Sequence, residues 1–340
     1  MPDIVGHLVD IHQYQKTQFS AYGGQYWFLV ESLILGFILC FRLIPYTTDL
    51  MVNASAGLAA KYFGNKSRTL VINASTNNPE LVNMVAAFCM RKAGGVANPL
   101  GSNLANIYLM YLVAPLYVML RWKLKRDTDR LQRFKKLIRT ERRLIYQHLG
   151  MAFLMFAFSI IGFWVLTASH PFGGLSEEVQ IQPGSFLIAA ALVCVIGIVA
   201  FQYWNKRLQE SDPELFEAID DEEHTDSWRQ FIGGTTGLVM SSFAVNWLFL
   251  AWTQIYEASL TVYLGAAIFT GLHYFVGALI TSLPEMNVAM EGYSKITRAD
   301  LNTALSAASV SNMTNLAIAV LGILLIILLK AMGLELSLQF

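Results

Sequence analysis

The sequence predicts an all-α membrane protein of about eight transmembrane helices, built as two inverted repeats. The first observation is composition, because 55% of the 340 residues are hydrophobic and only 14% are charged. Soluble domains carry about 25% charged residues. The second is a series of apolar segments, each close to the roughly 20 residues that a helix needs to cross a bilayer. The third is a polar pattern that occurs once in each half of the chain.

The first half of the chain predicts membrane spans at 24–61, 69–90, 98–120, 149–169 and 184–204. Pro45 interrupts the first span, and a proline inside a helix removes a backbone donor and bends the helix. Small residues follow it over 47–60, which favours close packing on a neighbouring helix. We therefore expect a long, kinked first span with a tightly packed partner.

The second half predicts spans at 230–256, 261–290 and 302–329, with a bend region at 253–259. The chain accordingly divides into two halves joined by an acidic linker at 205–229. The first half covers 1–204 and carries a repeat at about 69–120 together with a basic segment at 121–147. The second half covers 230–340 and carries a repeat at about 261–329.

Positive charge is concentrated in the basic segment, which holds 11 of the 24 Lys and Arg residues. Basic loops stay on the cytoplasmic side, so the segment 121–147 is predicted to be cytoplasmic. The linker 205–229 is separated from it by two predicted spans, so it is predicted to lie on the same side. Apolar residues at helical spacing, such as Leu131, Phe134 and Ile138, predict one amphipathic helix that lies on an anionic membrane surface. The simpler interpretation of this segment is a topology signal with a solvated connector, and a specific lipid or protein partner is the alternative.

The acidic linker contains nine Asp and Glu residues, including a cluster at 220–224. This cluster could hold a regulatory divalent cation, but it lacks the glycine-turned ligand spacing of an EF-hand loop. We therefore expect a solvated cytoplasmic linker. The net charge of the whole chain is zero, so no general attraction to nucleic acid is expected.

The repeated pattern combines a Pro-Glu pair in one span with a Ser-Asn-x-x-Asn pair in the next. The first copy occupies 75–80 and 101–106, and the second occupies 281–285 and 311–315. A carboxylate inside a membrane span is costly and by default marks an ion or substrate pathway. Under the predicted topology the two copies cross the membrane in opposite directions. They therefore predict an inverted-repeat helical transporter with its site at the repeat interface.

Each copy supplies hard oxygen donors. Pro79 leaves the carbonyl of Ser75 without its helical donor, and Pro284 does the same in the second copy. Oxygen ligands with two carboxylates suit Ca²⁺, with Na⁺, H⁺ and Mg²⁺ as competitors. Ser, Thr and Asn side chains in spans also commonly bond one helix to another. Taken singly they have this structural role as an alternative, whereas Glu80 and Glu285 are predicted to be functional.

These residues resemble the α-repeats of the cation/Ca²⁺ exchanger superfamily, which includes the sodium/calcium and calcium/proton exchangers. The family's elements resemble Gly-Thr-Ser-x-Pro-Glu and Gly-Ser-Asn/Asp-x-x-Asn, and the match covers about 47–115 and 253–325. The resemblance implies alternating access, with a sliding gating pair formed by the first and sixth spans. It implies that the metal ligands are Glu80, Glu285, Thr76, Asn77, Asn103, Thr281, Ser282 and Asn312.

The chain departs from this family pattern in number of spans and in motif residues. The family usually has about ten spans, and a homodimer or another partner would cover the surface that the missing two leave. Asn77 stands where the family has Ser, and Ile280 and Val310 replace motif glycines. The site would hold two negative charges at most, which predicts exchange closer to electroneutral than three Na⁺ per Ca²⁺.

The expected function is exchange of Ca²⁺ for Na⁺ or H⁺ by a multi-pass integral membrane protein. The alternatives are exchange of Mg²⁺ or Mn²⁺, and a transport-inactive homologue that serves as a membrane sensor or assembly subunit. No enzymatic activity is expected, because the sequence has no His-Glu-x-x-His or Gly-x-Ser-x-Gly motif. No cofactor is expected, and the expected partners are the transported ions and the bilayer, including anionic lipid at 121–147.

Overall fold

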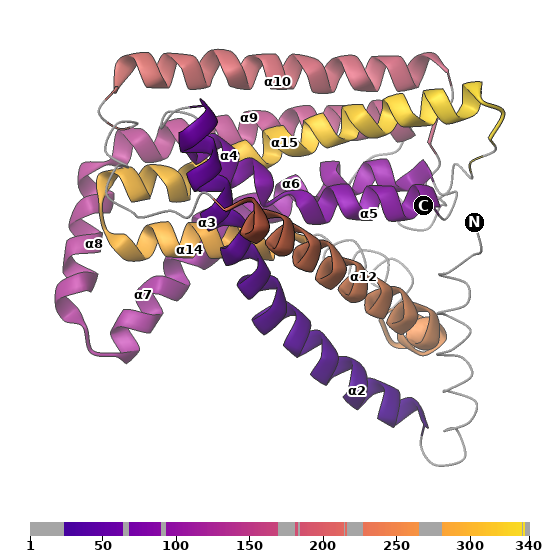
Figure 1. Cartoon of the computed structure of the whole chain (residues 1–340), viewed down its shortest axis with the longest axis horizontal. Helices are drawn as coiled ribbons and strands as arrows, with labels where there is room; N and C mark the ends of the chain where they lie inside the picture. Colours follow the sequence, from indigo (N-terminus) through magenta and orange to yellow (C-terminus); the bar gives the residue numbers. More distant parts are fainter. Residues whose placement is uncertain are drawn as a thin grey trace.

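The computed structural model describes residues 24–63, 68–89, 93–168, 181–182, 184–213, 215, 227–264, 281–334 and 336. Every regular element within these ranges is a helix (Figure 1). Five of the described helical stretches are long and apolar enough to cross a membrane: Tyr26–Ala59, Pro99–Leu124, Arg142–Thr167, Ser185–Ser211 and Arg298–Ala331. This confirms the prediction of an all-α membrane protein, while the total of about eight spans stays a prediction.

The first predicted span is one long helical path with a widened turn at its bend. It consists of α2 (Gly24–Ile38), a π-helical turn η2 (Leu39–Leu43) and α3 (Ile44–Phe63). Pro45 follows η2 and cannot donate a backbone hydrogen bond to the preceding turn. The backbone hydrogen bonds of that turn therefore take the wider π-helical pattern in place of the α-helical one. The interruption predicted from Pro45 is thus seen as a change from α-helix to a π-helical turn.

The second and third predicted spans are also interrupted. The second is divided into α4 (Arg68–Ser75) and α5 (Asn78–Cys89), followed by the short 3₁₀ helix η4 (Ala93–Val96). The third runs through α6 (Ala97–Tyr108), a π-helical turn η5 (Leu109–Val113) and α7 (Ala114–Leu124). Pro115 stands just after η5, as Pro45 does after η2, so the same local cause widens both helices.

The basic segment 121–147 was expected to form one amphipathic helix, and this prediction is wrong. Its first residues complete α7, its middle forms α8 (Thr128–Thr140), and its last residues begin α9 (Arg142–Thr167). Arg126 has a left-handed backbone with φ of 57°, which ends the turn after α7. Asp127 then caps α8 by accepting a hydrogen bond from the Arg130 amide at 3.1 Å. Only α8 is therefore the amphipathic helix.

The most deeply buried side chain of α8 is that of Phe134, which packs on the helical body together with Leu131, Leu137 and Ile138. Phe134 is buried, and its ring centre lies 5.5 Å from that of Trp122 and 6.0 Å from that of Tyr293. Both contacts are edge-to-face, which is a favoured geometry for aromatic pairs. The cationic side chains of α8 lie around this anchor on the exposed sides of the helix.

The second half is organised around α15 (Arg298–Ala331), most of whose side chains are buried. It packs against α6, α9, α10 (Ser185–Ser211) and α14 (Leu283–Lys295). Figure 1 shows α9, α10 and α15 running alongside one another, with α2 and α12 extending away at an angle. The acidic cluster at 220–224 and the predicted span residues 265–280 lie outside the described residues.

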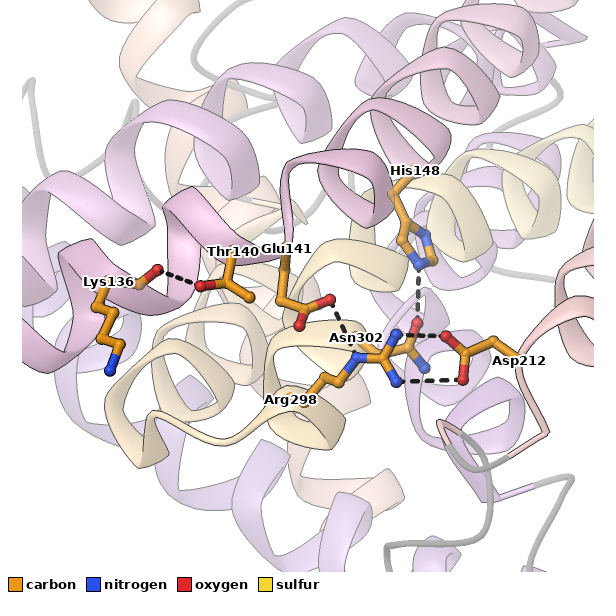
Figure 2. Close-up of polar contacts among 7 residues, drawn as sticks. All are labelled: Lys136, Thr140, Glu141, His148, Asp212, Arg298 and Asn302. Atoms are coloured by element: carbon orange, nitrogen blue, oxygen red, sulfur yellow. Dashed lines mark hydrogen bonds and ion pairs between the residues drawn. The ribbon is translucent and has the colours of Figure 1, made fainter.

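Three helix ends meet around the guanidinium of Arg298, at the start of α15 (Figure 2). Its Nε donates to Glu141, which precedes α9, at 3.0 Å, and its two terminal nitrogens bond Asp212, which follows α10. The carboxyl groups therefore come from the segments 121–147 and 205–229, and the arginine comes from the turn before α15. The start of α9, the end of α10 and the start of α15 therefore lie next to one another.

The helix α3, which belongs to the first predicted span, packs tightly against α12 (Trp228–Leu264). Gly234 makes this approach possible, because a Cβ atom there would lie 2.6 Å from the backbone nitrogen of Met51. A bend was expected at 253–259, but α12 is one unbroken helix through these residues. The segment contains neither Pro nor Gly, so it lacks the usual causes of a kink.

We expect Gly234→Ala to lower the stability of the protein by about 1–3 kcal/mol, because the added methyl group meets backbone that cannot move aside. Gly233→Ala is the matched control, since a Cβ at Gly233 meets nothing within 4 Å. Thermal unfolding followed by tryptophan fluorescence should give a midpoint lowered by about 4 °C for Gly234→Ala only. Equal midpoints for the two variants would contradict the close crossing of α3 and α12.

Candidate functional site

The two Pro-Glu pairs occupy equivalent places in interrupted helices. In the first copy Thr76 and Asn77 form a turn between α4 and α5. In the second, Ser282 forms a turn directly before α14. Each glutamate, Glu80 and Glu285, then lies in the first turn of the following helix. The sequence predicted that the prolines leave carbonyl groups without their helical hydrogen-bond donors. In the structure the α-helical conformation itself is interrupted by a turn just before each proline.

The backbone bonds that restart the two helices also correspond. The Leu81 amide donates to the Asn77 carbonyl at 3.3 Å, and the Met286 amide donates to the Ser282 carbonyl at 3.1 Å. The amide ends of two helices therefore surround the two carboxylates. A helix N-terminus carries partial positive charge, which stabilises an anionic side chain in the first turn.

Both carboxylates are buried, with relative exposures of 0% for Glu80 and 1% for Glu285. No Lys, Arg or His among the described residues forms an ion pair with either of them. Ser311 contacts both Glu285 and Asn77, which lies in the turn just before Glu80, so the two glutamates belong to one buried region. Two buried carboxylates without a compensating cation are costly. The protein itself supplies no positive side chain to offset this cost within the described part of the chain.

A reciprocal pair of hydrogen bonds joins the two Ser-Asn-x-x-Asn elements. Nδ2 of Asn103 donates to the Asn312 carbonyl at 3.2 Å, and Nδ2 of Asn312 donates to the Asn103 carbonyl at 3.2 Å. Asn103 also donates to the hydroxyl of Ser159 on α9. The two asparagines occupy the same position in the two motif copies, so exchanging the copies leaves this pair of bonds unchanged.

The remaining motif residues repeat this reciprocity. Nδ2 of Asn106 donates to Ser311 Oγ at 2.6 Å, and Nδ2 of Asn315 donates to Ser102 Oγ at 2.8 Å. All four side chains are buried with no measurable exposure. Ser311 Oγ also donates to Asn77 Oδ1 at 2.8 Å and lies 3.4 Å from Glu285 Oε1. The network therefore extends from the asparagines to the carboxylates.

The two kinds of asparagine differ in what their side-chain oxygens do. Oδ1 of Asn312 accepts from Asn106 at 3.0 Å, and Oδ1 of Asn103 accepts from Asn315 at 2.7 Å. By contrast, Oδ1 of Asn106 and Oδ1 of Asn315 have no hydrogen-bond partner, although both are buried. Buried polar atoms are nearly always satisfied. Asn106 and Asn315 therefore present two free amide oxygens that the predicted ligand set did not include.

Within the two Pro-Glu motifs, 75–80 and 281–285, four further side-chain oxygens have no hydrogen-bond partner: Oε1 and Oε2 of Glu80, Oε2 of Glu285 and Oγ of Ser282. Together with the two amide oxygens they are the orphan oxygens of the site. All are hard ligands, and none comes from His or Cys. Among the described residues no group of three or more His, Cys, Asp or Glu gathers as a metal cluster. The donors are therefore two carboxylates supplemented by neutral oxygens, which suits an alkali or alkaline-earth cation.

All eight residues of the predicted ligand set are buried in the described structure. Glu80, Glu285 and Ser282 contribute orphan oxygens. Thr76 differs, because its hydroxyl donates to the Asn73 carbonyl at 2.8 Å. Asn77 is bonded at both ends of its amide, through Ser311 and the Asn73 carbonyl. The family resemblance implied all eight positions, but only the contacts between helices show which side-chain oxygens have no hydrogen-bond partner.

We expect Asn103→Leu and Asn312→Leu each to lower stability by about 1–3 kcal/mol, because each leaves buried partners without a bond. The double variant should lose less than the sum of the two, since both substitutions break the same reciprocal pair. Thermal unfolding of the wild type, both single variants and the double variant provides the cycle. Strictly additive losses would show that the two asparagines do not act together.

Comparison of the chain with protein-family models, with curated proteins and with solved structures gave no match. The functional argument therefore depends on the residues and geometry of the site described above.

Proposed function

We propose that the protein is a membrane antiporter that exchanges Ca²⁺ for Na⁺ or H⁺ by alternating access. The observation that carries this proposal is the pair of buried glutamates, Glu80 and Glu285, whose carboxylate oxygens include three without a hydrogen-bond partner, in a chain whose described residues include five helices long and apolar enough to cross a membrane. Two buried carboxylates in one region gain most from a divalent cation, because it neutralises both charges at once.

The geometry assigns roles to the ligands. Glu80 and Glu285 would supply the charge, and the oxygens of Asn106, Asn315 and Ser282 would complete the coordination shell. A counter-ion that uses the same carboxylates cannot be bound at the same time as Ca²⁺. Exchange then follows, because each ion leaves before the other enters.

The reciprocal asparagine bonds support an inverted repeat as the basis of alternating access. Three pairs of hydrogen bonds relate the two motif copies by exchange. A site on such an internal pseudo-two-fold axis is equivalent toward both membrane faces. Exchanging the conformations of the two repeats would therefore expose the site to each face in turn. The packing of α3 on α12, at one side of this core, supplies two helices that can move as the gating pair.

The test is uptake of ⁴⁵Ca²⁺ into proteoliposomes of the purified chain, with an outward Na⁺ gradient in one arm and an outward proton gradient in the other. Uptake driven by one gradient, and abolished when that gradient is collapsed by an ionophore, is the expected result. Uptake in neither arm, from protein that is folded and monodisperse, would reject Ca²⁺ exchange.

Two alternatives are distinguished in the same vesicles. Uptake of Mn²⁺ or Mg²⁺ in place of Ca²⁺ would identify another divalent exchanger with the same ligands. Failure with all three cations would favour a transport-inactive homologue. In that case Ca²⁺ should still raise the thermal unfolding midpoint of the wild type if the orphan oxygens form a cation-sensing site.

A further inference from the structure

A basic cavity of about 720 Å³ lies between α8 and the turn from α14 to α15. Its charged lining residues are Arg130, Arg133 and Lys136 from α8 and Lys295 from the end of α14, and no acidic side chain lines it. The cavity is at the cytoplasmic end in the predicted topology and is separate from the buried carboxylates. It has no role in the proposed transport cycle.

Two of these cations are free of acidic partners. Arg130 pairs with Asp127 at 3.4 Å, and Lys295 pairs with Glu291 at 3.3 Å. Within the described part of the chain, by contrast, Arg133 and Lys136 make no ion pair. Figure 2 shows the Lys136 ammonium directed away from the Glu141–Arg298 pair. The cavity therefore has a net positive charge with unused donors.

The position of α8 places this cavity at the level of lipid headgroups. One candidate span ends at Leu124 and the next begins at Arg142, and α8 lies between them. The buried ring of Phe134 holds α8 against the ends of these spans. A basic amphipathic helix at this level is attracted to anionic lipids by each of its cations that lies near the membrane surface.

We propose that this cavity binds the phosphate-bearing headgroup of an anionic phospholipid, with Arg133 and Lys136 as the principal donors. Arginine can bind a phosphate through two parallel N–H···O hydrogen bonds, and lysine adds a point charge. A soluble phosphate compound offers the same chemistry, but the location beside two membrane spans favours the lipid. The proposal depends on this cavity and not on the transported ion.

The test is native mass spectrometry of the full chain released from detergent, titrated with phosphatidic acid or with phosphatidylcholine. We expect one phosphatidic acid molecule to bind much more tightly than phosphatidylcholine. Arg133→Gln combined with Lys136→Gln should weaken that binding roughly tenfold or more, since two cations are lost. Equal binding of the two lipids by the wild type would overturn the proposal.

The matched control is Lys135→Gln combined with Arg139→Gln. It removes the same charge from the same helix at exposed positions that do not line the cavity. We expect its binding of phosphatidic acid to change by less than about threefold, and equal losses in both double variants would show general electrostatic attraction and no site. Complete displacement of phosphatidic acid by millimolar inorganic phosphate would overturn the lipid assignment in favour of a soluble anion.

Discussion

Glu80→Gln and Glu285→Gln should each reduce gradient-driven ⁴⁵Ca²⁺ uptake at least about 100-fold. Each substitution removes one of the two charges that offset the cation, and loss of one partner of a buried charge pair costs about 3–5 kcal/mol. Neither glutamate has a neighbour that could replace it, because the other oxygens of the site are neutral. The two variants should therefore fail equally, despite lying in different halves of the chain.

Glu291→Gln is the matched control for this result. Glu291 is also on α14, but it is exposed and pairs only with Lys295 among the described residues. We expect its transport to remain within about twofold of the wild type, because an exposed ion pair contributes little. A comparable loss in Glu291→Gln would mean that uptake depends on the charge of α14 and not on the buried site.

Thermal unfolding separates loss of binding from loss of folding. Without Ca²⁺, the Gln variants should unfold at the same temperature as the wild type or above it, because they no longer bury an uncompensated carboxylate. Saturating Ca²⁺ should raise the wild-type midpoint by about 5 °C and leave the Gln variants unchanged. A lower midpoint in Ca²⁺-free buffer would indicate that the carboxylates stabilise the fold.

The class of the molecule and the location of its site follow from the sequence because both depend on local patterns. Apolar length predicts spans, and a Pro-Glu pair inside a span marks a costly carboxylate whatever the neighbouring helices are. Pro45 likewise predicted a bend, because the cause is the missing donor of that residue. Such inferences need no knowledge of tertiary packing.

The choice of free oxygens could not be predicted, because it depends on contacts between distant helices. Asn103 and Asn106 are three residues apart on one helix, so sequence spacing treats them alike. Only the approach of Asn312 and Asn315 decides which amide oxygen is satisfied and which is left free.

The break in the basic segment was missed for a different reason. Its turn contains neither Gly nor Pro, and Arg126 takes the left-handed conformation. The available signal was Asp127, which is a favourable N-cap residue immediately before α8.

Membrane potential should have little effect on the Ca²⁺ gradient that the wild type maintains. Under the proposed exchange, the two buried carboxylates would balance one Ca²⁺ in one half of the cycle and two monovalent ions in the other, so the complete cycle would move no net charge. One net charge moved across 100 mV is worth about 2.3 kcal/mol, which is a factor of about 50 in the accumulation ratio. A two-for-one exchanger should show a change below about twofold, so the two stoichiometries are clearly separated.

The measurement uses proteoliposomes with a fixed Na⁺ or proton gradient, in which a K⁺ gradient with valinomycin sets the potential to zero or to about 100 mV, inside negative. Vesicles that contain Glu80→Gln report any passive Ca²⁺ leak at each potential. A shift of about 50-fold in steady-state Ca²⁺ accumulation would require a third monovalent ion per cycle. The two carboxylates would then be insufficient to balance the bound ions. A neutral ligand such as Asn106 or Asn315 would have to hold the third ion, because the Oδ1 atoms of these two buried residues have no hydrogen-bond partner.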